Sequence, residues 1–103
     1  MNTHHYYTYI VKCSDDSYYT GVTNDLERRI AEHNGKFAPN SYTFTRRPVV
    51  LVFFEAFSSI EQAIAFEKQV KGWSRKKKEA IIANEWHKLP GLSRNKQSRK
   101  NDE

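Results

Sequence analysis

The chain has 103 residues, 38% of them hydrophobic, and its 17 Lys and Arg against 12 Asp and Glu give a formal net charge of +5. One cysteine, Cys13, excludes an internal disulfide and a multi-cysteine zinc site and is typical of a reducing compartment. No apolar stretch reaches the roughly 18 residues that a membrane span needs, so we expect a cytoplasmic protein with no membrane contact.

The first predicted element is a β-hairpin. Residues 6–13 (YYTYIVKC) and 17–22 (SYYTGV) are rich in β-branched and aromatic residues, and SDD between them supplies a turn. A three-residue loop would place Tyr9 and Tyr19 on one face of the hairpin, whereas a two-residue turn would place Tyr18 there. The turn lacks the glycine that two-residue hairpin loops favour, so we predict the pair of Tyr9 and Tyr19.

A short helix is predicted over residues 24–34. Asn24 and Glu27 form a capping box, and an Asn-Gly pair ends the helix. One stripe of the helix, taken at about 100° per residue, holds Leu26, Ile30 and His33. Arg29 lies at the edge of this stripe and should face the sheet, whereas Arg28 should face water.

A loop and a third strand follow the helix. The segment 35–48 has no sustained period and many turn residues, so we expect a loop that brings Arg46 and Arg47 to the surface. Residues 49–57 (VVLVFFEAF) are almost continuously apolar. This pattern predicts a strand that is covered on both faces or lies centrally in a small sheet.

The second helix carries a carboxylate on its apolar stripe. Ser58 and Glu61 form a capping box, and the helix should run until Gly72. Its apolar positions at helical spacing are Ile60, Ala63, Ile64, Phe66 and Val70. Glu67 falls within this stripe, and an unpaired buried charge is too costly, so Glu67 either pairs with Lys71 or binds a metal ion.

The third helix should begin near Ser74, start with the basic run RKKK and end near Asn84, which is a typical capping residue. The predicted order is therefore β-β-α-β-α-α. A chain of this length supports one hydrophobic core, so we expect one domain over residues 1–90. The polar, basic segment 91–103 has little to bury and should be a disordered tail.

These side chains together suggest phosphodiester chemistry. A single glutamate, with waters and phosphate oxygens, is an acceptable Mg²⁺ site, because Mg²⁺ keeps much of its hydration. An arginine would offset developing charge, and a tyrosine hydroxyl or its phenolate would orient and deprotonate water. The residues alone leave open which tyrosine is the base.

The spacing resembles the GIY-YIG nuclease domain family. YTY at 7–9 stands at the first motif and YTG at 19–21 at the second, followed by DLERRIAEH at 25–33. The segments RRPVVLVFFEAF, AIAFEKQVKGWSRKKKEAII and NEWHKL resemble the small stand-alone members, so the similarity spans about residues 6–89. The chain departs from the family pattern at Tyr7, Thr8 and Val22.

The resemblance implies a compact α/β (α+β) fold, with a three-stranded antiparallel sheet flanked by helices, and Mg²⁺-dependent cleavage of nucleic acid, with Mn²⁺ as an alternative ion. It also implies roles for six residues. By position, Glu67 is the metal ligand, Arg29 the phosphate contact, and Tyr9 and Tyr19 the hydroxyl pair. His33 completes the helix motif, and Asn84 matches a late asparagine of the family.

The first hypothesis is a small endonuclease with loose sequence specificity or a dependence on substrate structure, acting on DNA in preference to RNA. The charge distribution predicts its phosphate contacts to be Arg46, Arg47, Lys71, Arg75, Lys76, Lys77 and Lys78. The alternatives are a DNA- or RNA-binding module without efficient turnover, and an adaptor whose aromatic groove docks another protein. A solvated basic surface with no polyanionic partner explains the charge equally well.

Overall fold

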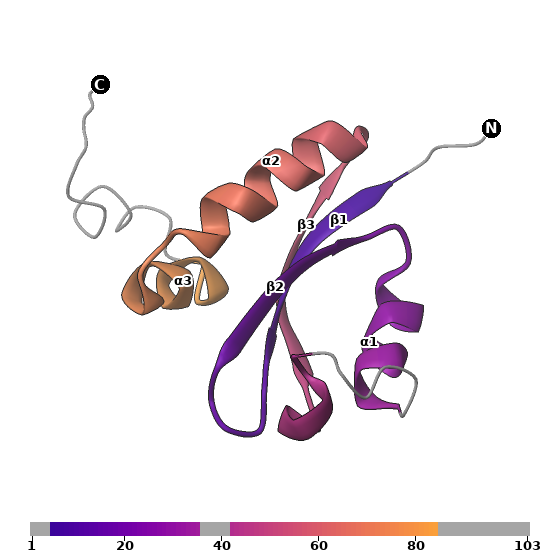
Figure 1. Cartoon of the computed structure of the whole chain (residues 1–103). Coiled ribbons are helices and arrows are strands. Elements are labelled where there is room, and N and C mark those ends of the chain that lie inside the picture. The colour runs from indigo at the N-terminus through magenta and orange to yellow at the C-terminus, as the bar shows by residue number, and fades with distance from the viewer. Residues whose placement is uncertain (1–4, 36–41, 85–103) are drawn as a thin grey trace. The chain divides into compact units, whose positions relative to one another are not determined.

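The computed structural model describes residues 5–35 and 42–84. Its elements, in chain order, are β1 (Tyr6–Lys12), β2 (Tyr18–Thr23), α1 (Leu26–Asn34), the 3-10 helix η1 (Phe44–Arg46), β3 (Val50–Phe57), α2 (Ile60–Lys71) and α3 (Arg75–Ile82). The order of strands and α-helices is the predicted one (Figure 1). No helix in the described residues is long and apolar enough to cross a membrane.

The chain divides into two compact units, residues 1–68 and residues 69–103. The first unit holds the sheet, α1, η1 and most of α2, and the second holds the end of α2 and α3. The single domain over residues 1–90 stays a prediction, and the predicted tail at 91–103 lies outside the described residues.

The three strands of the described sheet are antiparallel in the order β2-β1-β3. The central strand is β1, and four consecutive side chains of β1 are fully buried: Thr8, Tyr9, Ile10 and Val11. The predicted central or doubly covered position of residues 49–57 is therefore wrong, because β3 lies at the edge of this sheet, where Val50 is 61% and Phe54 51% exposed. An apolar run alone does not distinguish a central strand from an edge strand.

The hairpin has the predicted three-residue loop. The Cys13 N–H donates to the Ser17 carbonyl at 2.8 Å, and Asp16 takes the left-handed conformation with φ of 69°. A short polar residue tolerates this conformation in place of glycine. In the resulting register Tyr9 lies opposite Gly21, and Tyr19 lies opposite Val11, two pairs further along, on the same face.

The alternation of β1 sends its side chains to two different helices. On one face, Tyr9, Val11, Cys13 and Val49 form a core against which Leu26 and Ile30 of α1 pack, with Tyr19 and Leu51. On the other face, the Thr8 hydroxyl donates to the Ala63 carbonyl of α2 at 2.7 Å, and the rings of Phe53 and Phe57 contact Phe66. Consequently α1 and the first turns of α2 cover opposite faces of the sheet (Figure 1).

The first two helices begin one residue later than predicted. The N-cap of α1 is Asp25, not Asn24, and its carboxylate accepts the backbone N–H three residues on at 3.1 Å. At the start of α2, the hydroxyl of Ser59, not Ser58, accepts the corresponding N–H at 3.4 Å. Both segments offer two adjacent capping residues, so the composition did not decide between them. For α3, the predicted cap Ser74 is confirmed.

The inward stripe of α2 is narrower than predicted. Ala63 and Val70 are fully buried, but Ile60 and Ile64 are 40% and 37% exposed. Glu67 follows Ala63 by four residues and precedes Val70 by three, so it lies on the buried side of the helix. It is half-buried.

Candidate functional site

The site is built around Tyr9, whose ring lies over Gly21 of the neighbouring strand. A Cβ atom added to Gly21 would lie 2.5 Å from Tyr9 Oη and 2.8 Å from Cζ. Glycine at position 21 is therefore needed for the close approach of a tyrosine ring. The ring of Tyr9 thus occupies the space above Gly21.

Two side chains of α1 meet the Tyr9 hydroxyl. His33 Nε2 lies 2.8 Å from Tyr9 Oη, and Arg29 Nε donates to the same oxygen over a longer 3.4 Å. Arg29 and His33 are four residues apart, so they project from the same side of the helix. The predicted orientation of Arg29 towards the sheet is confirmed, and Arg28 is exposed as expected.

The second ring nitrogen of His33 contacts Thr43, a residue for which the sequence predicted no role. His33 Nδ1 lies 2.8 Å from the hydroxyl of Thr43, which is fully buried. Thr43 directly precedes η1, inside the segment predicted only as a loop. Nothing in its sequence context marks this threonine, because the contact depends on how the loop folds back onto α1.

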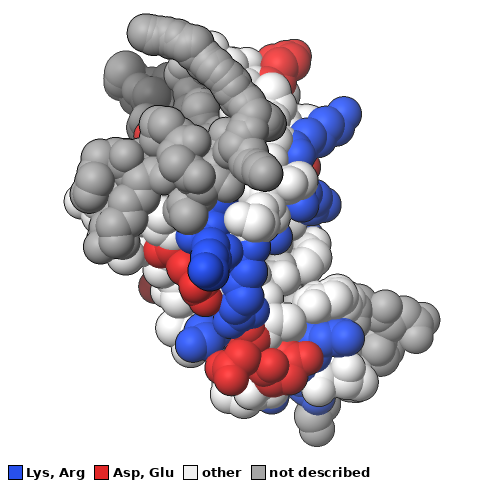
Figure 2. Space-filling view, turned by 90° about the vertical axis from the view of Figure 1, so that its left-hand side faces the viewer, with Lys and Arg blue, Asp and Glu red and all other residues white. Residues whose placement is uncertain are grey.

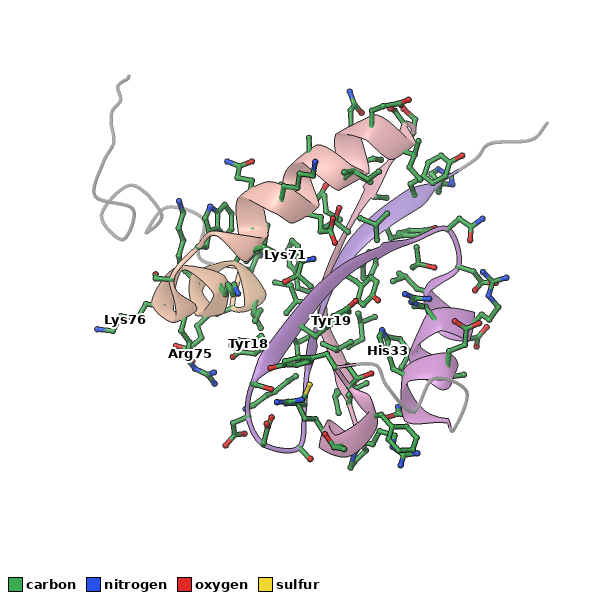
Figure 3. The ribbon with its side chains drawn as sticks, in the orientation of Figure 1. Tyr18, Tyr19, His33, Lys71, Arg75 and Lys76 are labelled. Carbon is green, nitrogen blue, oxygen red and sulfur yellow. The ribbon has the colours of Figure 1, made fainter. Side chains whose placement is uncertain are left out.

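Tyr19 joins the cluster through its ring. Tyr19 of β2 and His33 of α1 are labelled in Figure 3, and their ring centroids are 5.2 Å apart in an edge-on arrangement. The centroid of the Tyr9 ring lies 6.4 Å from that of Tyr19. Tyr42 stacks on Tyr19 at 5.8 Å, and the guanidinium carbon of Arg46 lies 3.9 Å from the Tyr42 centroid.

These contacts set the protonation of the cluster. Burial raises the pKa of Tyr9, against the hydrogen bond from Arg29, and the charges of Tyr19 and Glu67 raise it further. The hydrogen bond to Tyr9 raises the pKa of Arg29. Burial, with the nearby Arg29 charge, lowers the pKa of His33 below its usual value. At neutral pH, Tyr9 is therefore a neutral phenol, Arg29 a cation and His33 a neutral imidazole.

Glu67 belongs to a helix that packs against the other face of the sheet. It lies in α2, and this face is opposite to the rings of Tyr9 and Tyr19. Its charge nevertheless contributes to the raised pKa of Tyr9. Within residues 5–35 and 42–84, no three His, Cys, Asp or Glu side chains are grouped so that they could hold a metal ion.

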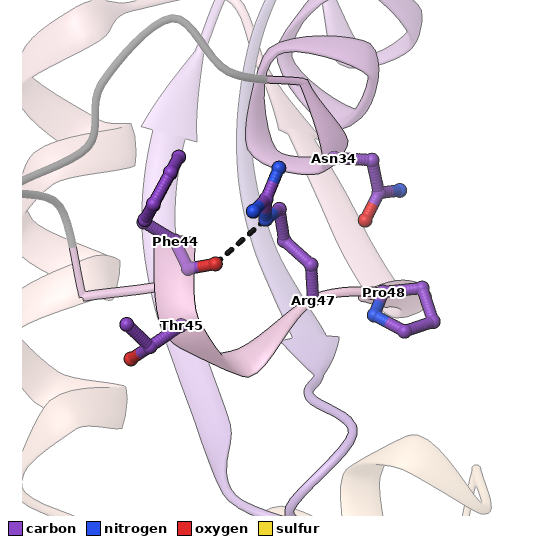
Figure 4. Close-up of a pocket in the computed structure, with 5 residues that line it drawn as sticks. All are labelled: Asn34, Phe44, Thr45, Arg47 and Pro48. Atoms are coloured by element: carbon purple, nitrogen blue, oxygen red, sulfur yellow. Dashed lines mark hydrogen bonds between the residues drawn. The ribbon is translucent and has the colours of Figure 1, made fainter.

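The two arginines of the loop are bound to the protein itself. Arg46 Nε lies 3.1 Å from Asp15 Oδ2, and Arg46 Nη1 donates to the Tyr42 carbonyl at 2.8 Å. Arg47 donates to the carbonyls of Phe44 at 2.6 Å and Gly35 at 2.9 Å. A pocket of about 520 Å³ next to it is lined by Asn34, Phe44, Thr45, Arg47 and Pro48 (Figure 4). Both arginines are half-buried, so they are less available to a ligand than predicted.

The remaining predicted phosphate contacts lie in the second unit. Lys71, Arg75 and Lys76 are exposed, and Figure 3 shows Lys76 pointing outward from α3. Lys77 Nζ lies 4.5 Å from the Trp73 ring centroid, and burial lowers the pKa of both Lys77 and Lys78. On the face shown in Figure 2, basic side chains are interleaved with acidic ones.

Asn84 ends the described part of the chain. It has a left-handed φ of 62°, and its backbone N–H donates to the Ile81 carbonyl at 3.0 Å, which is how a residue just beyond a helix satisfies an orphan carbonyl. This geometry gives Asn84 a capping role. Its part in a site stays a prediction from the family resemblance.

Paired tyrosines on a three-stranded antiparallel sheet, next to an arginine and a histidine of the following helix, are the arrangement that the GIY-YIG resemblance implies. A family model described as the GIY-YIG catalytic domain matches residues 5–80, and the chain belongs to this family. Its members are typically endonucleases, which implies nucleic acid as the substrate.

The similar proteins are small and match over most of their length. The UPF0213 protein YazA of Bacillus subtilis is 48% identical over 83 residues, which cover 80% of this chain and 82% of YazA. The UPF0213 protein SH2523 of Staphylococcus haemolyticus is 54% identical over 78 residues, 75% of this chain and 93% of that protein. The solution NMR structure of the UPF0213 protein BH0048 from Bacillus halodurans matches with a TM-score of 0.51 at 36% identity, covering 88% of this chain and 99% of that one.

Two departures from the family pattern have structural counterparts. Thr8, in the first motif, uses its hydroxyl to hold the carbonyl of Ala63 on α2. Tyr7 packs edge-on against Phe54 of the edge strand, with ring centroids 5.9 Å apart. Both side chains contact the protein outside the Tyr9 cluster, so these departures leave that cluster intact.

Proposed function

We propose that the protein is a metal-dependent endonuclease that hydrolyses phosphodiester bonds in DNA, in the cytoplasm, with selectivity for substrate structure rather than extended sequence. The observation that carries the proposal is the convergence of Tyr9, Tyr19, Arg29 and His33 on the α1 face of the sheet. One titratable cluster then offers hydroxyl groups and a permanent cation to a phosphate.

The residues divide the work by their exposure. Tyr9 is fully buried, whereas Tyr19 is half-buried and Arg29 has a side chain 42% exposed. Arg29 therefore contacts the phosphate and offsets the charge that develops on it. The Tyr19 oxygen orients the attacking water and, in its phenolate form, accepts the proton of that water, while Tyr9 holds Arg29 and His33 in place.

Glu67 fits a weakly held, hydrated divalent ion. It is half-buried on the inward side of α2, and Mg²⁺ accepts one protein carboxylate when waters and substrate oxygens complete its shell. When bound, Mg²⁺, or Mn²⁺ in its place, would polarise the phosphate and stabilise the leaving oxygen. The strand β2 lies at an edge of the described sheet. The proposal therefore requires a substrate along this edge to be contacted from both faces of the sheet, by Arg29 and Tyr19 from one and by Glu67 from the other.

A non-catalytic DNA- or RNA-binding module is the second candidate. The observation that favours it is the position of Glu67 on a helix that packs against the face opposite to the tyrosines. Such a module would keep the exposed basic residues of α2 and α3 as phosphate contacts and would bind without cutting.

Cleavage of labelled nucleic acids separates the two candidates. Linear, nicked and branched DNA, with matched RNA, are incubated with the protein and Mg²⁺ or Mn²⁺. The variants are Glu67→Gln and Arg29→Ala, and each has a control of the same charge change at an exposed position, Glu55→Gln and Arg28→Ala.

We expect cleavage of at least one DNA substrate by the wild type and by both controls. Glu67→Gln and Arg29→Ala should each reduce the rate by roughly 100-fold or more, while binding changes little. Absence of metal-dependent cleavage by the folded protein on every substrate, combined with tight binding, would leave the binding module as the function.

A further inference from the structure

Thr43 is a buried member of a chain of hydrogen-bonded side chains that runs through the site. Arg29 Nε, Tyr9 Oη, His33 and Thr43 Oγ1 follow one another, and the two contacts of the imidazole are both 2.8 Å. We propose that Thr43 is a positioning residue whose hydroxyl accepts a hydrogen bond from His33 Nδ1–H, fixing the tautomer and the orientation of the imidazole. Its relevance to catalysis rests on the proposed function.

The tautomer follows from the partners of Tyr9. Tyr9 is fully buried and keeps its proton, so leaving its hydroxyl without an acceptor would be costly. Among the residues that the structure describes, Tyr9 Oη has two hydrogen-bond partners, Arg29 Nε and His33 Nε2. The arginine nitrogen is always a donor, so His33 Nε2 is the one that can accept. A neutral imidazole with Nε2 as acceptor carries its proton on Nδ1. Thr43 Oγ1 is then the group that receives this proton's hydrogen bond.

The loop holds Thr43 in place from both sides. The residue before it, Tyr42, is stacked between Tyr19 and the guanidinium of Arg46. The Thr43 carbonyl accepts the Arg46 N–H at 3.0 Å. The hydroxyl therefore has a fixed place relative to the imidazole, as an orienting group requires.

The same loop is fastened to the end of α1, the helix that carries His33. The Asn34 side-chain oxygen accepts the Val49 N–H at 2.7 Å, its amide donates to the Val49 carbonyl at 3.1 Å, and Arg47 bonds the Gly35 carbonyl. The segment that carries Thr43 and the helix that carries His33 are therefore also joined by these hydrogen bonds at the end of α1. The hydroxyl can then act as a fixed reference for the ring.

A fixed tautomer matters for Arg29. If Nε2 carried the proton instead, His33 and Arg29 would both donate to Tyr9 Oη, and the phenol proton would turn away from both. The oxygen would then share its lone pairs between two donors. With Nε2 as acceptor, the hydrogen bonds run in one direction from Arg29 to Thr43, and each strengthens the next. Thr43 thereby holds Tyr9 and, through it, the guanidinium that faces the phosphate.

The test reads the tautomer directly and does not need catalysis. Nitrogen-15 NMR of the imidazole nitrogens distinguishes the Nδ1-protonated from the Nε2-protonated ring in the wild type at neutral pH. His5, which is exposed, serves as the internal reference for an unconstrained ring. Thr43→Val removes the hydroxyl at nearly constant volume, and Thr43→Ser restores a hydroxyl at the same atom.

We expect the wild type and Thr43→Ser to show the Nδ1-protonated ring at His33, and Thr43→Val to show a weaker preference, because only the Tyr9 hydroxyl then favours this tautomer. If the wild type cleaves DNA, Thr43→Val should cut its rate roughly ten- to a hundredfold, with most of the rate restored in Thr43→Ser. A wild-type ring protonated at Nε2, or a folded Thr43→Val with an unchanged spectrum at His33, would overturn the inference. The wild-type spectrum decides the tautomer even if Thr43→Val does not fold. Lack of cleavage with the expected spectra would count against the proposed function alone.

Discussion

Replacing Gly21 by alanine tests the packing on which the site is built. The new methyl would lie 2.5 Å from Tyr9 Oη, 2.8 Å from Cζ and 3.1 Å from Cε2. An unstrained contact needs roughly 3.5 Å, so the ring must move by about 1 Å. Tyr9 is fully buried and its hydroxyl lies 2.8 Å from His33 Nε2, so it has little freedom to yield.

The cost of such overpacking is about 1–3 kcal/mol of unfolding free energy. For a chain of this size, we expect the melting temperature to fall by roughly 10 °C, and urea denaturation should give a matching decrease in midpoint. Gly72→Ala is the matched control, because the nearest atom to its added Cβ, the Gln69 carbonyl oxygen, is 3.6 Å away. That variant should be as stable as the wild type or slightly more stable.

The Tyr9→Phe background shows whether the clash is the cause. Removing Oη deletes the atom at 2.5 Å and leaves Cζ at 2.8 Å, so part of the strain is relieved. We expect Gly21→Ala to cost about 1 kcal/mol less in Tyr9→Phe than in the wild type. A Gly21→Ala protein as stable as the Gly72→Ala control, or an equal penalty in both backgrounds, would refute this account of the packing.

Three further predictions concern single side chains. The folded-state pKa of His33 is lowered, so on acidification the unfolded chain binds a proton at this residue before the folded protein does. The contribution of His33 to the free energy of unfolding should therefore be constant above about pH 6.5 and fall as the pH drops below that value towards the folded-state pKa. Thermal unfolding across this range should show a smaller loss in His33→Gln, and an identical pH dependence would contradict the burial of this ring. Thr8→Val removes the bond to the Ala63 carbonyl and should cost about 1 kcal/mol in urea denaturation, with no change counting against it. Lys76 is exposed, so it is available to a phosphate. In Lys76→Gln, the slope of the logarithm of the DNA-binding constant against the logarithm of salt concentration should become shallower by about one unit. An unchanged slope would exclude this lysine as a phosphate contact.

The sequence predicted the arrangement of Tyr9, Tyr19, Arg29 and His33 because each step was local. The hairpin register follows from the length of one turn, and the helix face follows from a spacing of four residues. Contacts between neighbouring elements of this kind leave a clear periodic signal. The structure confirms that the two rings share one face and that Arg29 meets Tyr9.

The predictions were wrong or incomplete where the place of a residue depends on how several helices and strands pack together. The edge position of β3 depends on which strand β1 selects as its second neighbour, and the exposure of Ile60 and Ile64 depends on the rotation of α2 above the sheet. The face of the sheet on which the helix of Glu67 packs also depends on how the chain continues from β3 into α2. Likewise, Thr43 reaches His33 only through the folded loop.

The central claim is that the side chains on the sheet face covered by α1, Tyr19 among them, catalyse cleavage of nucleic acid. The most direct test compares the single-turnover cleavage rate of Tyr19→Phe with that of Tyr18→Phe. Both variants remove one hydroxyl from adjacent residues of β2, whose side chains point to opposite faces. The account predicts a rate roughly 100-fold below the wild type for Tyr19→Phe and a rate near the wild type for Tyr18→Phe. Equal rates for the two variants, or a larger loss in Tyr18→Phe, would contradict it.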